Sequence, residues 1–205
     1  MDLFSILIGL TIVLLSLTIH EAAHAWTADR LGDPTARLLG RVSLNPIVHI
    51  DPIGTILLPV VAAYSGLPII GWAKPVPVNI SRLKHGSRDF VIVAAAGPLS
   101  NLAQAVVAAI VLRILLPGGS DVGVLLTVLE RIVFINLLLA FFNLVPIPPL
   151  DGGNVLAGLL PYRAAAVFVG LRQYGFILLY VLMLTGILDD LIWPPTELVG
   201  RILLP

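Results

Sequence analysis

Long apolar runs separated by short polar loops make up most of this chain. The first run covers residues 3–28 and has no charged residue between Leu3 and Ile19. Further runs cover about residues 90–116, 122–143 and 164–188. Each run has at least the roughly 20 residues that a helix needs to cross a hydrocarbon core about 30 Å thick. The pattern therefore predicts several membrane-spanning helices.

The run at residues 52–73 is also uncharged, but prolines and glycines interrupt it. We expect a helix over about residues 53–63 followed by an irregular return, which at membrane depth needs cover from protein or a wet cavity. Residues 71–80 should be extended, because Pro75 and Pro77 forbid a regular helix. The expected fold is an all-α polytopic membrane protein with about four to five transmembrane helices and a re-entrant, extended hairpin segment.

The composition supports an integral membrane protein. The 205 residues are 58% hydrophobic and 12% charged, whereas about 25% of the residues of a soluble domain are charged. The formal net charge is zero, which gives no reason to expect a nucleic-acid partner. The chain has no cysteine, so disulfides and cysteine-bound metals are excluded.

Basic residues gather in the loops on one side of the predicted helices. Cytoplasmic loops of membrane proteins are enriched in Lys and Arg, so these loops should face the cytoplasm of the cell membrane. The turn at residues 117–121 and the acidic tail after residue 188 should lie on the opposite side. The basic residues concerned are Arg30, Arg37, Arg41, Lys74, Arg82, Lys84, Arg88 and Arg163.

A candidate metal motif, His20-Glu21-Ala22-Ala23-His24, lies near the end of the first run. Residues four apart on a helix project from the same face, so His20 and His24 can grip one divalent metal. Glu21 lies about 100° around the helix from His20, within reach of a water molecule at that metal as a general base. Zinc suits such ligands. So short a pattern also occurs by chance, but ionisable residues in an apolar segment are functional candidates.

A catalytic zinc site usually has three protein ligands, so one more is needed. Asp151 stands out because a proline-rich run precedes it and two glycines follow it, which stiffens the backbone before it and frees the backbone after it. Taken alone, Pro-Leu-Asp-Gly also fits an ordinary turn with an exposed aspartate. His49 and Asp51 could form a second polar site, although loop hydrogen bonds and a helix cap are more usual for such a pair.

Two motifs far apart in the chain together resemble the site-2 protease family of intramembrane zinc metalloproteases. The first motif is H-E-x-x-H at residues 20–24. The second is N-x-x-P-x-x-x-L-D-G, which reads Asn-Leu-Val-Pro-Ile-Pro-Pro-Leu-Asp-Gly at residues 143–152. Gly97, Pro98 and Asn101 also resemble a family pattern in the helix between the two motifs.

The resemblance implies a ligand set and a reaction. It implies that His20, His24 and Asp151 bind one zinc ion per chain, with Glu21 as the general base. It also implies that Asn143 polarises the substrate carbonyl. Family members cleave transmembrane proteins within or near the lipid bilayer. We therefore expect a single-span transmembrane substrate, with the active site toward the cytoplasmic side.

The resemblance covers about residues 5–187, so residues 1–205 are expected to form one integral-membrane metalloprotease domain without a separate soluble domain. Residues 71–80 match in place the hairpin that is thought to contact substrate. Substrate-binding residues are then expected at Trp72, Lys74, Val76 and Asn101. Many members carry an extra transmembrane helix before the first motif, and often a PDZ or regulatory domain. We expect neither here, which leaves substrate selection open.

Two other functions stay open. A catalytically silent membrane adaptor would not need His20, Glu21, His24 and Asp151 intact. A metal transporter would favour several ligand sets along a path, whereas this chain offers one compact set. The sequence does not indicate the oligomeric state or the identity of the substrate.

Overall fold

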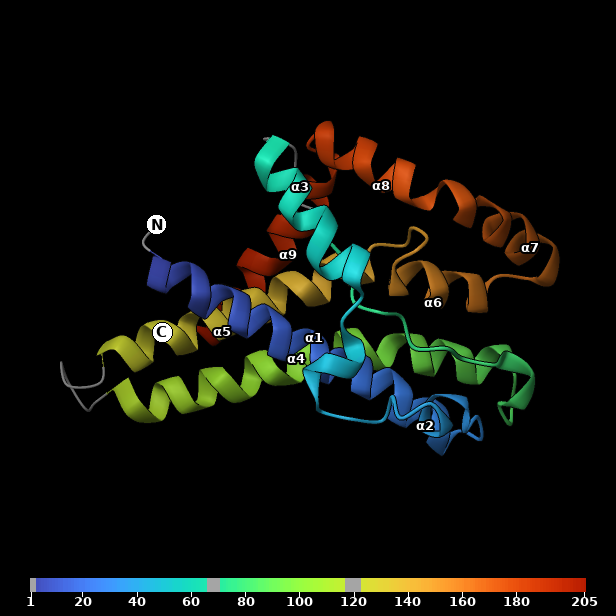
Figure 1. Cartoon of the computed structure of the whole chain (residues 1–205), viewed down its shortest axis with the longest axis horizontal. Helices are drawn as coiled ribbons and strands as arrows, with labels where there is room; N and C mark the ends of the chain where they lie inside the picture. Colours follow the sequence, from blue (N-terminus) through green and yellow to red (C-terminus); the bar gives the residue numbers. More distant parts are fainter. Residues whose placement is uncertain (1–2, 66–70, 117–122) are drawn as a thin grey trace.

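The computed structural model describes residues 3–65, 71–116 and 123–205, and these residues contain helices but no strand. The all-α expectation is therefore confirmed for the part of the chain that is described. The elements, in chain order, are α1 (Leu3–Arg30), α2 (Thr35–Leu38), η1 (Pro46–His49), η2 (Pro52–Leu57), α3 (Leu58–Ser65), η3 (Ile80–Arg82), α4 (Ser87–Leu115), α5 (Gly123–Leu144), α6 (Asp151–Leu159), α7 (Tyr162–Gly170), η5 (Leu171–Tyr174), α8 (Gly175–Leu184) and α9 (Ile187–Leu203) (Figure 1).

Four stretches of the described chain are long and apolar enough to cross a membrane. Three are the single helices α1, α4 and α5, and the fourth is Arg163–Leu184, which joins α7, η5 and α8. The shortest of these three helices, α5, has 22 residues. At about 1.5 Å per residue it is about 33 Å long, enough for a hydrocarbon core of about 30 Å. The protein is therefore a multi-pass membrane protein, as the apolar runs predicted.

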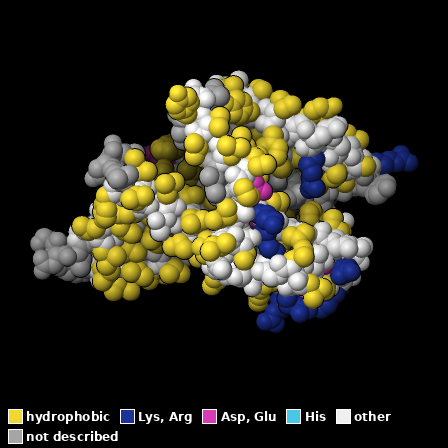
Figure 2. Space-filling view, in the orientation of Figure 1, with side chains coloured by type: hydrophobic (Ala, Val, Ile, Leu, Met, Phe, Trp, Pro, Cys, Tyr) yellow, Lys and Arg dark blue, Asp and Glu magenta, His cyan; other side chains and the backbone are white. Residues whose placement is uncertain are grey.

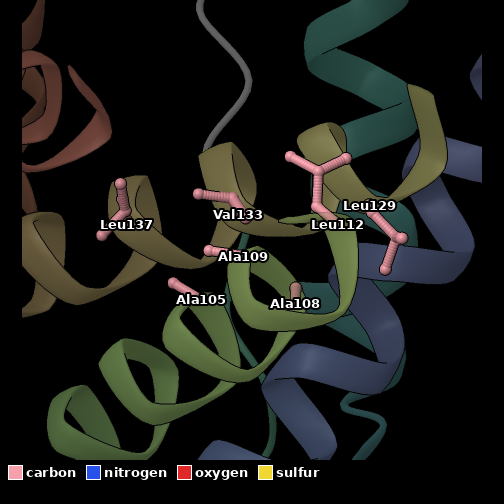
Figure 3. Close-up of a cluster of buried hydrophobic side chains, with 7 residues drawn as sticks. All are labelled: Ala105, Ala108, Ala109, Leu112, Leu129, Val133 and Leu137. Carbon is pink, nitrogen blue, oxygen red and sulfur yellow. The ribbon is translucent and has the colours of Figure 1, made fainter. Parts of the chain in front are cut away.

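Helix α4 packs against both α1 and α5 (Figure 1). Small residues let helix backbones approach closely in a membrane. Alanines dominate the α4 side of the buried cluster between α4 and α5, where larger side chains of α5 pack onto them. Figure 3 shows this cluster, made of Ala105, Ala108, Ala109, Leu112, Leu129, Val133 and Leu137.

The re-entrant segment agrees with the prediction over its described residues. The helical turns η2 and α3 cover Pro52–Ser65, close to the predicted helix at 53–63. Asp51 caps this helix, because its Oδ1 accepts hydrogen bonds from the N–H groups of Ile53 (2.9 Å) and Gly54 (2.7 Å). The predicted return at residues 66–70 lies outside the described residues. Residues 71–79 are in neither helix nor strand, as expected for an extended segment.

The last apolar run differs from the single helix that was expected. The 3₁₀ turn η5 interrupts it between α7 and α8, and α8 then ends before Gly186, which adopts a left-handed conformation with φ 77°. The last run was expected to end at about residue 188, with Asp189 and Asp190 in an acidic tail beyond it, and this was wrong. They lie in the first turn of a new helix, α9, where carboxylates are stabilised by the positive end of the helix dipole.

The two ends of the bundle differ in charge. The end of α1, the short helix α2, the start of α4 and the α6–α7 connection lie together at one end, which we call the basic end (Figure 1). On the face drawn in Figure 2, Lys and Arg side chains gather at this end. The C-terminus lies toward the opposite end (Figure 1). There, Arg113 of α4 donates hydrogen bonds to the carbonyls of Ile202 (2.8 Å) and Leu203 (3.3 Å).

Asp33 ties the loop after α1 to the extended segment at the basic end. Its Oδ1 accepts hydrogen bonds from the backbone N–H (3.1 Å) and the hydroxyl (2.5 Å) of Thr35, and its Oδ2 accepts one from the N–H of Asn79 (2.6 Å). Burial alone would raise the pKa of Asp33, but these donors stabilise the carboxylate and hold its pKa below the ordinary value. The ionised carboxylate therefore stabilises this junction.

We predict that Asp33→Asn lowers the thermal stability of the purified protein at neutral pH. A carboxylate with a lowered folded-state pKa stabilises the fold above its unfolded pKa of about 3.9, and this contribution is lost as the pH falls through the lower folded value. The Tm difference between wild type and variant should therefore be largest near neutral pH and shrink below about pH 4. Thermal unfolding in detergent at several pH values measures this difference.

The control for this comparison is Glu130→Gln, which changes an exposed carboxylate in α5. It should leave the Tm at neutral pH close to that of wild type. A Tm difference for Asp33→Asn that stays constant between neutral and acidic pH would contradict the role of the charge.

Candidate metal centre and active site

Three side chains from two distant parts of the chain converge on one point. His20 and His24 lie one helical turn apart on α1, and Asp151 is the first residue of α6. Oδ2 of Asp151 is 3.1 Å from Nε2 of His20 and 3.2 Å from Nε2 of His24, and the two Nε2 atoms are 3.0 Å apart. Within the described residues, this is the one group of three or more His, Cys, Asp or Glu side chains spaced for a metal.

The outer nitrogen of each imidazole is held by an oxygen atom of α4. His20 Nδ1 lies 2.6 Å from Oδ1 of Asn101, and His24 Nδ1 lies 2.7 Å from the carbonyl oxygen of Val93. An oxygen acceptor requires a proton on Nδ1, so each neutral ring keeps its lone pair on Nε2. Both lone pairs therefore point toward Asp151. Metal-ligating histidines are commonly oriented in this way through their second nitrogen.

The geometry fits a divalent metal such as zinc. Zinc–nitrogen and zinc–oxygen bonds of about 2.0–2.1 Å place tetrahedral ligand atoms about 3.3 Å apart, close to the three separations observed. Oδ2 of Asp151 is buried and has no hydrogen-bond partner among the described residues. Two nitrogen lone pairs and a carboxylate oxygen repel one another at this distance unless a cation neutralises them. These three atoms are therefore arranged to bind a cation between them and not to contact one another directly.

A buried chain of polar side chains extends from His20 into the bundle. Asn101 donates from Nδ2 to Oδ1 of Asn136 on α5 (2.9 Å), and Asn136 donates to the hydroxyl of Ser16 on α1 (3.0 Å). Asn101 and Asn136 are both 0% exposed. Asn136 and Ser16 were not predicted from the sequence, although a lone asparagine in an apolar spanning run signals an inter-helix hydrogen bond. Because this chain links α1, α4 and α5, it holds the ring of His20 in place.

Glycines let the three backbones approach one another. A Cβ atom at Gly97 would collide with the Nε2 atoms of His20 and His24, so only glycine lets α4 pass this close to the imidazoles. A Cβ atom at Gly152 would collide with the backbone carbonyls of Leu144 and Val145. Gly152 thus lets α6 start against the end of α5, which brings Asp151 to the histidines.

The other predicted site residues lie in different positions relative to this group. Glu21 is half-buried beside His20 on α1, where a general base is expected. Asn143 is half-buried at the end of α5, and its Nδ2 donates to the carbonyl of Leu139 one turn earlier (2.9 Å). Asn101 was expected to contact substrate, and its complete burial behind His20 gives that expectation no support.

The remaining predicted substrate residues belong to the extended segment at 71–79. Trp72 is half-buried, and its ring lies 4.8 Å from that of Phe176 on α8. The side chain of Lys74 is exposed and that of Val76 is half-buried. These side chains lie along one stretch of backbone that is in neither helix nor strand, and their contact with substrate stays a prediction.

Comparisons with known proteins agree with this arrangement. The model of peptidase family M50 matches residues 119–185, which include Asn143 and Asp151. The curated protein "Putative zinc metalloprotease YwhC" of Bacillus subtilis is 39% identical over 187 residues, which are 89% of this chain and 82% of YwhC. "Putative zinc metalloprotease Rip2" of Mycolicibacterium smegmatis is 31% identical over 177 residues, which are 86% of this chain and 66% of Rip2.

No solved structure gives a significant match to the chain. The likeness to YwhC nevertheless covers most of both chains at 39% identity, and the family match falls on the segment that carries Asp151. The resemblance inferred from the two motifs is confirmed, and this multi-pass membrane protein belongs to peptidase family M50.

Proposed function

We propose that this protein is an intramembrane zinc metalloendopeptidase in which His20, His24 and Asp151 hold the metal and Glu21 is the general base. The observation that carries the proposal is the convergence of two imidazole lone pairs and an unpaired carboxylate oxygen within 3.2 Å. Membership of a peptidase family and the zinc metalloprotease names of the relatives support it.

Glu21 is the chain's own proton carrier in this mechanism. When bound, zinc supplies a Lewis acid that polarises a peptide carbonyl and makes water a nucleophile near neutral pH. Glu21 takes the proton from the attacking water and passes it to the leaving amine. His20 and His24 already point at the metal position, so Glu21, about 100° further around the helix, is free to act as a base.

Neither alternative function explains the site as well. A transporter would need successive ligand sets along a path, whereas the described residues offer a single set, at His20, His24 and Asp151. An adaptor would not require Gly97, whose absent side chain leaves room for both imidazoles. The cost of keeping ionisable groups inside an apolar helix favours a catalytic use.

The substrate in this proposal is a single-span transmembrane protein that is cleaved at the cytoplasmic side. The peptide bonds of a membrane helix are satisfied internally, so the substrate must unwind locally before it is attacked. The extended segment at 71–79 supports this, because an unwound strand can pair with such backbone through main-chain hydrogen bonds. The enrichment of Lys and Arg at the basic end supports the cytoplasmic placement.

We predict that Glu21→Gln keeps zinc and the fold while losing proteolysis. Glutamine matches glutamate in size but cannot accept the proton, and general-base roles contribute roughly 10²–10⁴-fold to the rate. Cleavage of a tagged single-span membrane protein in liposomes, measured at matched zinc content, checks this. Glu130→Gln, which changes an exposed glutamate of α5, is the matched control and should cleave like wild type. Cleavage that survives both Glu21→Gln and a zinc chelator would rule out the metalloprotease assignment.

We also predict that the basic end faces the cytoplasm. The chain has no cysteine, so single cysteines introduced at the exposed positions Ser81 and Pro205 are clean probes of the two ends. An impermeant thiol reagent added to intact cells should label Pro205→Cys but not Ser81→Cys, and both should react after the cells are opened. The reverse pattern in intact cells would invert the proposed topology.

A further inference from the structure

Arg41 is a buried cation for which the proposed mechanism has no use so far. It follows α2 and the left-handed Gly40 (φ 70°), and its backbone N–H donates to the carbonyl of Ala36 (2.9 Å). The residue is only 5% exposed. A charge is rarely buried without a partner, because desolvation is costly. The burial of Arg41 therefore calls for a functional explanation.

The contacts of Arg41 lead to the extended segment. Its Nη2 donates to the backbone carbonyl of Lys74 and reaches that of Pro75 (3.5 Å). No carboxylate lies within ion-pair distance of Arg41 in the described part of the chain, and its Nε has no hydrogen-bond partner there. The guanidinium therefore binds backbone carbonyls instead of a carboxylate, which holds the backbone at residues 74–75 in place.

The carboxylate of Glu21 is the negative charge that acts on the pKa of Arg41. Burial lowers the pKa of Arg41 below its ordinary value, and the charge of Glu21 opposes this by favouring the guanidinium cation. The charge of Glu21 thus acts on Arg41, whose guanidinium is hydrogen-bonded to the segment proposed to hold substrate.

The residues that follow Arg41 lie beside α1, whereas the side chain of Arg41 contacts the extended segment at 71–79. After Arg41 the chain runs along α1, since Val42, Ser43 and Leu44 line an open groove of about 470 Å³ together with Ile19, Ala22, Ala23 and Trp26. On its other side Arg41 reaches the extended segment. The loop that begins at Arg41 thus lies beside α1, which carries the base, while the Arg41 side chain holds the backbone at 74–75.

Residues 72 and 74 of the extended segment are hydrogen-bonded to the rest of the protein through their backbone groups. The N–H of Trp72 donates to the carbonyl of Gly54 (3.2 Å), the N–H of Lys74 donates to that of His49 (2.8 Å), and the carbonyl of Trp72 accepts from the hydroxyl of Thr55 (2.8 Å). Residues 72 and 74 are two apart, so their backbone groups point to the same side of an extended chain. The bond from Arg41 to the carbonyl of Lys74 completes the edge formed by residues 72 and 74. On the other edge, Pro75 and Pro77 have no N–H, and the carbonyl of Pro75 is 3.5 Å from Nη2 of Arg41.

We propose that Arg41 is a positioning residue for proteolysis, which clamps the backbone at Lys74 and Pro75 to the loop that follows α2 and thereby sets which substrate peptide bond reaches Glu21. The inference rests on the proposed function. Arg41 touches neither the metal ligands nor the reacting atoms in this role. It acts through the segment at 71–79, whose register relative to the metal centre it fixes.

The test compares Arg41→Gln, Arg41→Lys and wild type as full-length proteins in liposomes. Glutamine removes both the charge and the fork of donors, whereas lysine keeps the charge but offers a single ammonium. Zinc content should match wild type in both variants. The value of kcat should fall roughly 10–100-fold in Arg41→Gln, since small misplacements cost rate, and less in Arg41→Lys. Mass spectrometry of the products should show cleavage spread over neighbouring bonds in Arg41→Gln.

A second readout does not depend on activity. Hydrogen exchange of the backbone amides at 72–79 should become faster in both variants, while exchange in α1 and α4 stays as in wild type. Arg37→Gln is the matched control, because Arg37 is an exposed arginine of the same loop region whose partner is Asp29 (2.7 Å). It should leave rate, products and exchange at 72–79 unchanged.

The outcomes separate the two proposals. Wild-type kcat, a single wild-type product and unchanged exchange in Arg41→Gln would overturn the role of Arg41, provided that Glu21→Gln is inactive in the same assay. If Arg41→Gln does not fold, the same three results in Arg41→Lys would overturn it. Cleavage by Glu21→Gln at the wild-type rate would instead remove the proposed function, whatever the Arg41 variants do.

Discussion

The structure depends on bringing three unprotonated ligand atoms together inside an apolar bundle. Two imidazole lone pairs and a carboxylate oxygen lie 3.0–3.2 Å apart, a spacing at which they repel one another without a cation. In a membrane such groups are expensive to bury. The surrounding chain must therefore hold the three ligand atoms rigidly, at a spacing where a divalent metal between them offsets their repulsion.

Much of the bundle's polar structure serves that requirement. Asn101 and the carbonyl of Val93 fix the two rings from α4, and Asn136 passes the support of His20 on to α5 and α1. Gly97 gives the imidazoles room. The catalytic chemistry proposed for Glu21 needs little more than this scaffold and a segment that presents an unwound substrate. The clamp proposed at Arg41 would connect those two parts.

The parts of the site set by local periodicity were predictable from the sequence, and the parts set by tertiary packing were not. His20 and His24 follow from helical spacing alone, and Asp151 was selected by its flanking prolines and glycines together with the family motifs. The separate helix α9 was missed because Asp189 and Asp190 fit a helix start as well as a helix stop. Arg41 entered the sequence analysis only as a topological charge, since nothing local reveals its burial.

Zinc-edge X-ray absorption on the purified protein tests whether His20, His24 and Asp151 hold the metal. We expect a nitrogen and oxygen shell at about 2.0–2.1 Å with the scattering pattern of two imidazoles. One imidazole should disappear from the pattern in zinc-loaded His24→Ala, and bound zinc should fall in both His24→Ala and Asp151→Ala, while His85→Ala, which changes an exposed histidine, should match wild type. A spectrum without imidazole scattering, or one that is unchanged in both His24→Ala and Asp151→Ala, would contradict the assignment of the metal centre.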